Sequence, residues 1–265
     1  NLCIMYDSQI IFVRSVELER TIFERNVFLQ FMFNVIEAFI PSSLAQVCIA
    51  PTFYFLHLLN QDQLSQSLFP LGEIDKKEVR EIAKNQQFGN ADKKDSTGIC
   101  FIGERPFSEF LTTFLPKEKG DIIDQDGSFI KHHNGLPFYT IGQRKGLEIG
   151  GGFGESQEPW FVADKLVDSN KIVAVQGNHQ MLYHNSLVAD DVHWIDEEPQ
   201  FPINCSAKIR YRQASQECSV NIKDDGTIQV NFSDPQRAIT PGQSIVFYNS
   251  DTCLGGSVIK SRANE

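Results

Sequence analysis

The sequence predicts an α+β chain of several domains: a helical segment, a small mixed or β central domain, and a C-terminal antiparallel β-barrel or sandwich. Its 265 residues exceed what one hydrophobic core usually needs. Helical spacing of apolar residues holds as far as Pro116, and apolar–polar alternation replaces it afterwards. From Phe201 onward, short alternating segments recur at even spacing. The expected domains are residues 1–105, 106–190 and 191–265.

Two helices are predicted before Pro116. The segment EIDKKEVREIAKNQQFG, residues 73–89, starts with Asp75 as N-cap, and Glu78 completes a capping box. Its apolar residues share one face, and Gly89 fits the left-handed position after the last turn. A second helix is expected from Pro106, because apolar residues behind it recur at helical spacing: Phe107, Phe110, Leu111 and Phe114.

Strands are predicted after these helices. Residues 120–133, GDIIDQDGSFIKHH, form a hairpin around Asp126 and Gly127. Six further segments alternate: WFVADK (160–165), KIVAVQG (171–177), CSAKIRYRQ (205–213), ECSVNIK (217–223), TIQVNF (227–232) and SIVFYN (244–249). Turns are expected between the last of them, at DDG, DPQ and TPGQ.

Composition argues against several classes of protein. The formal net charge of −10 disfavours a chain coated in basic surface for nonspecific nucleic-acid binding, although a local basic groove is compatible with it. The six cysteines include no C-x-x-C pair and the six histidines lie at no ligand spacing, so we expect no metal site and a reduced, cytoplasmic chain. No secretory signal is visible, and the most apolar run, residues 26–40, is too short to cross a bilayer.

The first fifty residues differ in composition from the rest. All 18 glycines lie at or after Gly72, and the chain begins with Asn. An ordinary α/β domain needs glycines at its tight turns and helix ends. The segment is either part of a helical packing layer or a fragmentary or misread start, and we favour the second interpretation.

Cys100 stands in KKDSTGICFIGER, a polar, glycine-flanked connector between the two predicted helices. One interpretation is a buried cysteine that acts as a small hydrophobe. The other is a reactive thiol, because Lys93, Lys94 and Arg105 could stabilise a thiolate on an exposed loop. The residues alone leave both interpretations open.

A glycine-rich segment, NGLPFYTIGQRKGLEIGGG, spans residues 134–152 and surrounds Arg144 and Lys145 with six glycines. It is either a surface loop or a segment whose backbone approaches a phosphate chain closely. It lacks the Walker spacing of a nucleotide-binding P-loop.

The segment KIRYRQ is a second candidate for contact with an anion. On a strand, Lys208, Arg210 and Arg212 share one face, which suggests an anionic partner; the alternative, a merely solvated face, stays open. Tyr211 points the other way by alternation, unless a strand end brings it round to stack on a base.

These motifs, in this order, resemble the bacterial tRNA-specific 2-thiouridylase family. The resemblance runs from about Phe53 to the C-terminus, four-fifths of the chain, and rests on KKDSTGICFIGERPFSEFL, GQRKGLEIGGG, EPWFVADK, KIRYRQ, TPGQSIVFYN and CLGG. It implies that the helical segment is the remnant of a PP-loop α/β domain. It also implies an enzyme that modifies tRNA by transferring sulfur.

Members of this family adenylate the 2-oxygen of the tRNA wobble uridine with ATP, and a cysteine persulfide then delivers sulfur to C2. Cys100 matches the persulfide-bearing cysteine, which a sulfur-relay donor protein loads. Three of the candidate residues match positions that touch tRNA, namely Arg210, Tyr211 and Gln243. The full predicted tRNA-binding set is Arg210, Tyr211, Gln243, Lys208, Arg212, Arg144 and Lys145.

Residues 1–52 depart from the family's pattern. They carry neither the S-G-G-x-D-S pyrophosphate loop for ATP nor the other catalytic cysteine in a matching context. Ala50, Pro51 and Thr52 stand where a Lys-Asp-Gln tripeptide precedes FYFL in the family. We therefore expect this chain to lack the ATP site and to be inactive by itself. The alternatives are a non-catalytic tRNA- or protein-binding module and a thiol redox enzyme, which the absence of C-x-x-C disfavours.

Overall fold

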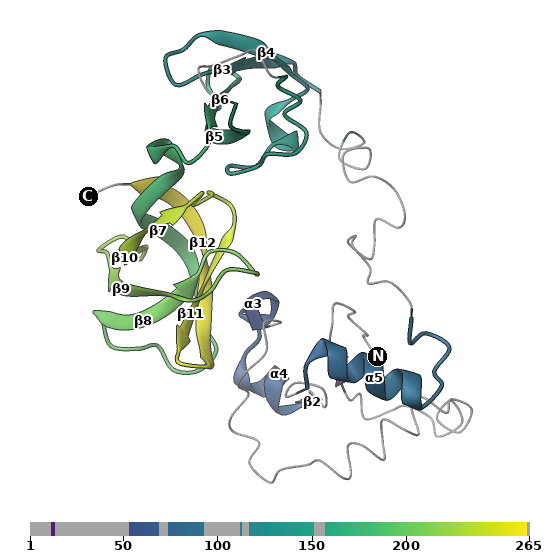
Figure 1. Cartoon of the computed structure of the whole chain (residues 1–265). Helices are drawn as coiled ribbons and strands as arrows, with labels where there is room; N and C mark the ends of the chain where they lie inside the picture. Colours follow the sequence, from purple (N-terminus) through teal and green to yellow (C-terminus); the bar gives the residue numbers. More distant parts are fainter. Residues whose placement is uncertain are drawn as a thin grey trace.

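Figure 1 shows the computed structural model of the chain, which describes residues 12–13, 53–68, 74–92, 112, 117–150 and 157–263. Cys100 lies outside these residues. So do the predicted leader, apart from residues 12–13, and the predicted helix behind Pro106, apart from Thr112. Within the described residues, no helix combines the length and the apolar character needed to cross a membrane.

Short helices open the described part of the chain: α3 (Phe53–Leu56), α4 (Gln61–Ser65) and α5 (Lys76–Asn85), together with the strand pair of β1 (Phe12–Val13) and β2 (Ser67–Leu68). The N-cap predicted for α5 is confirmed, because the Asp75 carboxylate accepts hydrogen bonds from the backbone N–H groups of Lys77 and Glu78. At the N-terminus of α4, Asn60 and Gln63 form a reciprocal capping box.

The predicted end of α5 is wrong by two residues. Gln87, with φ of 57°, takes the left-handed position predicted for Gly89. The N–H of Gln87 donates to the carbonyl of Lys84, and the N–H of Phe88 donates to that of Ala83, both at 2.9 Å. These two bonds make a Schellman motif. An apolar residue, here Phe88, commonly follows the left-handed position in this motif.

A four-stranded sheet forms the central domain, in the order β4-β3-β6-β5: β3 (Gly120–Ile123), β4 (Phe129–His133), β5 (Trp160–Leu166) and β6 (Lys171–Gln176). The β3–β4 hairpin is confirmed, with the Asp124 carboxylate accepting from the N–H groups of Asp126 and Ser128. The single turn η1 (Leu136–Phe138) follows it, and the sheet's apolar face buries Ile122 and Val162 completely.

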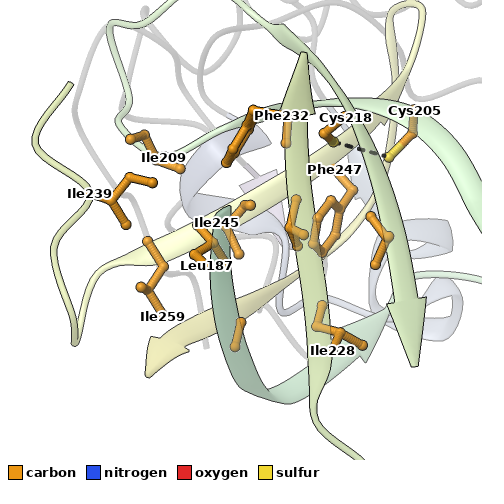
Figure 2. Packing of buried hydrophobic residues seen from close by; sticks show 14 residues of the cluster. Leu187, Cys205, Ile209, Cys218, Ile228, Phe232, Ile239, Ile245, Phe247 and Ile259 are labelled. Atoms are coloured by element: carbon orange, nitrogen blue, oxygen red, sulfur yellow. Dashed lines mark hydrogen bonds between the residues drawn. The ribbon is translucent and has the colours of Figure 1, made fainter. Parts of the chain in front are cut away.

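The C-terminal strands close into an antiparallel barrel in the order β10-β7-β12-β11-β8-β9: β7 (Tyr183–Trp194), after the turn η2 (Gln180–Leu182), β8 (Ile203–Lys208), β9 (Gln216–Ile222), β10 (Ile228–Arg237), β11 (Ser244–Asn249) and β12 (Thr252–Ala263). The structure thus selects the barrel over the sandwich. Figure 2 shows Phe247, Ile245 and Leu187 pointing into its interior, where none is more than 1% exposed.

Two of the barrel strands, β12 and β10, are not regular along their whole length. β12 contains Gly255 and Gly256 and shifts register twice against β7, so apolar residues do not keep a period of two. The turn predicted at DPQ lies instead within β10, whose register shifts between Asn231 and Gln236, because Pro235 cannot donate to the ladder. The boundary predicted after residue 190 falls inside β7, and the division into domains stays a prediction.

Antiparallel pairing places two loops at the same end of the barrel. The pairs Ala207–Gln216 and Phe232–Cys218 show that the β8–β9 loop, residues 209–215, lies at the end where β10 finishes. The β10–β11 loop, residues 238–243, therefore lies at this end too. We call it the site end of the barrel. The β9–β10 turn is at the opposite end.

Helix α3 packs on the outside of the barrel. Tyr54 joins a buried cluster with Val246 and Tyr248 of β11, and its hydroxyl donates to the carbonyl of Ser244 at 2.8 Å. A Cβ on Gly256 would lie 2.3 Å from the His57 ring, so this strand position has room only for glycine. Figure 1 shows α3 beside β11.

Replacing Phe247 by alanine is expected to lower the free energy of unfolding of the barrel by about 3–5 kcal/mol, because the fully buried ring leaves a cavity. Urea unfolding followed by Trp194 fluorescence in a Trp160→Phe background isolates the barrel, since the chain has two tryptophans. The matched control is Phe129→Ala, whose ring is 55% exposed. Equal losses in both variants would contradict this packing.

Candidate functional site

The prediction that Lys208, Arg210 and Arg212 share one strand face is wrong. β8 ends at Lys208, and the chain turns there, with the N–H of Gln213 donating to the carbonyl of Arg210 at 3.1 Å. The Lys208 ammonium lies over the Tyr248 ring, 5.0 Å from its centroid. Arg212 is exposed, whereas Arg210 is partly buried and reaches the central domain.

A pair of glutamines fixes this turn, and no local pattern in the sequence indicates it. The Gln213 side chain accepts from the N–H of Ile209 at 3.1 Å and donates to Oε1 of Gln236 at 2.7 Å. Gln236 is 4% exposed, and its own amide donates to the carbonyl of Asp234 at 2.7 Å. Because buried amides need partners, this network sets the conformation of the β8–β9 loop.

Arg210 bridges the barrel and the central domain. Its Nη2 donates to the carbonyl of Ile141 at 2.9 Å, to that of Ala238 at 3.1 Å and to Oγ1 of Thr240 at 2.9 Å. Burial lowers the pKa of Arg210, partly opposed by Tyr54, but an arginine keeps its charge in proteins. Arg210 was predicted to touch tRNA, but in the structure one of its nitrogens joins the two domains.

The two loops that Arg210 joins contain the same turn. Residues 140–143 and 240–243 both read T-x-G-Q, and in both the glutamine N–H donates to the threonine carbonyl, at 2.9 and 3.2 Å. Gly142 and Gly242 have φ of 84° and 83°, which favours glycine. The repeated tetrapeptide was visible in the sequence, although its pairing in space was not.

Both turns are attached to a strand in the same way. In the first turn, the N–H of Gly142 donates to the carbonyl of Val162 and the N–H of Val162 donates to that of Gln143, at 2.8 and 3.0 Å. In the second turn, Gly242 and Gln243 make the same two bonds with Ile259, at 2.8 and 2.9 Å. The first turn is therefore fixed to β5 and the second to β12.

Exposed polar side chains extend from both turns. Arg144 and Lys145 follow the first turn and are exposed, and Gln243 ends the second turn and is also exposed. The Gln143 side chain accepts from the N–H of Thr140 and donates to the carbonyl of Lys145, which orders the loop between them. Arg144 lines a cleft of about 230 Å³ in the central domain.

An aromatic cluster lies beside the β8–β9 loop. The rings of Tyr211 and Phe55 are 4.7 Å apart between centroids, and Tyr54 lies 6.3 Å from Tyr211. Phe55 is 52% exposed. The strand end has thus turned Tyr211 toward α3, where it supports an exposed ring of the kind on which nucleic-acid bases stack.

The cysteines of the described residues lie away from solvent. Cys205, Cys218 and Cys253 are buried, and burial raises the pKa of Cys253 to about 11. Cys205 and Cys218 face each other with their sulfur atoms 3.8 Å apart. No three His, Cys, Asp or Glu side chains in the described part of the chain lie close enough to hold a metal ion.

Comparison with known proteins finds three domain families in succession. Residues 51–104 match the tRNA methyl transferase HUP domain, residues 108–176 the tRNA methyl transferase PRC-barrel domain, and residues 184–259 the aminomethyltransferase beta-barrel domain. The third match coincides with the closed barrel, and the second includes the central sheet.

The chain is also similar to curated proteins named tRNA-specific 2-thiouridylase MnmA. The protein from Ruthia magnifica subsp. Calyptogena magnifica is 65% identical over 209 residues, which are 79% of this chain and 58% of the relative. That from Vesicomyosocius okutanii subsp. Calyptogena okutanii is 61% identical with the same coverage, and that from Francisella philomiragia is 54% identical over 208 residues, 78% of this chain and 58% of the relative.

The chain thus spans 58% of the length of these curated relatives. Its similarity to them extends across the helices, the central sheet and the barrel, and all three domain families occur in one order. Over the matched residues, this chain belongs to the tRNA-specific 2-thiouridylase family.

Proposed function

We propose that this chain takes part in ATP-dependent transfer of sulfur from a cysteine persulfide to C2 of the tRNA wobble uridine, in the cytoplasm. Cys100 carries the persulfide, and the site end of the barrel binds tRNA together with the first T-x-G-Q turn. The Arg210 bridge supports this proposal most directly. It joins the loop that contains Tyr211 to the loop that contains Arg144, and this link between predicted tRNA-binding residues of two domains favours a shared surface.

The proposed chemistry proceeds in three steps. ATP transfers AMP to the 2-oxygen of the uridine and releases pyrophosphate, which makes that oxygen a good leaving group. The terminal sulfur of the Cys100 persulfide then attacks C2, and AMP departs with the oxygen. Finally a second thiol attacks the Cys100 sulfur, which leaves the transferred sulfur on the base and a disulfide on the protein.

Cys205, Cys218 and Cys253 do not suit the role of the second thiol, because all three are buried. Residues 1–52 contain no glycine and hence no S-G-G-x-D-S loop. We therefore propose that this chain alone does not complete the reaction. Incubation with ATP, sulfide and unmodified tRNA is expected to yield no 2-thiouridine by nucleoside mass spectrometry, and robust turnover would contradict this.

Loading of sulfur onto Cys100 tests the proposed carrier directly. After treatment with inorganic polysulfide, peptide mass spectrometry is expected to find one added sulfur on Cys100, because Lys93 and Lys94, close to it in the sequence, favour a thiolate. Cys100→Ser is expected to abolish this modification. Cys253→Ala is the control and is expected to load normally, since the raised pKa of Cys253 keeps it protonated.

A chain that binds tRNA but never carries sulfur on Cys100 would instead be a non-catalytic RNA-binding module. Persulfide found in equal amounts on the buried cysteines would also argue against a specific carrier.

The salt dependence of tRNA binding tests the proposed surface. Arg144→Gln and Lys145→Gln are each expected to reduce the slope of log affinity against log salt by about one, because each removes a phosphate contact. The control is Lys223→Gln, an exposed lysine at the opposite end of the barrel, which is expected to leave the slope unchanged. The same loss of slope in Lys223→Gln would place the RNA elsewhere.

A further inference from the structure

The contact between the central domain and the barrel, here called the junction, is tight at the backbone. A Cβ at Gly142 would lie 2.5 Å from the Cβ of Ala238. Ala238 belongs to the β10–β11 loop, yet it is buried within the apolar core cluster of the central domain. Since each T-x-G-Q turn is fixed to its own strand, the junction alone determines how the two turns lie relative to each other.

Arg210 holds the junction from the barrel side. Its Nη2 is within hydrogen-bond distance of Ile141 in the first loop and of Ala238 and Thr240 in the second. Hydrogen bonds from charged donors are stronger than those between neutral groups. Because the guanidinium of Arg210 is partly buried, water competes less for these bonds.

Arg262 holds a second point of the junction. From β12, its Nη2 donates to the carbonyl of Ala163 at 2.8 Å and to the carboxylate of Asp164 at 2.7 Å, both on β5. This contact involves neither turn. Loss of Arg210 is therefore expected to loosen the turns while Arg262 still keeps the two domains together.

We propose that Arg210 is a positioning residue for RNA: it fixes the two T-x-G-Q turns side by side, so that both meet one stretch of the tRNA sugar–phosphate backbone. Arg144 and Lys145 supply the charge from the first turn, and Gln243 supplies hydrogen bonds from the second. This inference rests on the proposed function, which it extends from a set of residues to a two-domain surface.

A thermodynamic cycle on the affinity for unmodified tRNA tests this role. Arg210→Ala is expected to weaken binding about tenfold, and so is Gly142→Ala, which removes no charge but forces the junction apart. When Arg144→Gln is combined with Arg210→Ala or with Gly142→Ala, the further loss of affinity is expected to be small. In both variants the first turn is displaced, so Arg144 no longer reaches the RNA that the second turn binds. Arg210→Lys is expected to resemble Arg210→Ala, since the lysine nitrogen is one bond too short to reach Ile141.

The opposite pattern overturns the proposal. If Arg210→Lys binds like the wild type, Gly142→Ala is neutral, and the effects of Arg210→Ala and Arg144→Gln multiply, then Arg210 contacts a phosphate directly. Circular dichroism of each variant verifies that the barrel is folded. If Arg210→Ala is unfolded, Gly142→Ala is used for the test instead.

Hydrogen exchange without RNA separates this inference from the proposed function. The amide of Gly142 is expected to exchange faster in Arg210→Ala, because the first turn loses its packing on the barrel, and to be unchanged in Arg144→Gln. If the wild type binds no tRNA, the proposed function fails, whereas faster exchange still supports the role of Arg210 at the junction. Unchanged exchange in Arg210→Ala overturns that role whatever the RNA result.

Discussion

Closure of the six-stranded barrel is the constraint on which the rest of the structure depends. Pairing of β9 with β10 and of β10 with β7 leaves no free edge among these strands, and the interior is filled by side chains such as Phe247 and Ile245. Because consecutive strands run in opposite directions, the β8–β9 and β10–β11 loops are held at one end. The candidate surface is therefore a consequence of strand order.

The junction with the central domain turns this barrel end into a composite surface. Backbone carbonyls, two arginines and a glycine without room for a side chain determine the contact between the domains. In the proposed function, this surface orients the RNA, while Cys100 carries the sulfur.

Local patterns predicted much of the fold. The N-cap at Asp75 and the β3–β4 hairpin follow from short-range chemistry, and both are confirmed. β12 was missed because its glycines and register shifts break the alternation, and the end of α5 was missed because a Schellman motif formed at Gln87. These features depend on contacts that a local period does not encode.

The candidate site was less predictable than the fold. Arg210 was singled out from its charge and its motif, but its partners lie about seventy residues upstream and thirty downstream, as the sequence separations of its hydrogen bonds show. The two T-x-G-Q turns were readable as a repeat, yet only the junction brings them together. Cys100 stays a prediction, since it lies outside the described residues.

A hydrogen-exchange footprint of unmodified tRNA on the chain tests the central claim most directly. The account predicts slower exchange on RNA binding in three segments that are far apart in sequence, residues 140–145, 209–213 and 240–243, and no change at residues 223–227 at the other barrel end. Protection confined to residues 223–227, or to one T-x-G-Q turn without the other, would contradict a shared two-domain surface.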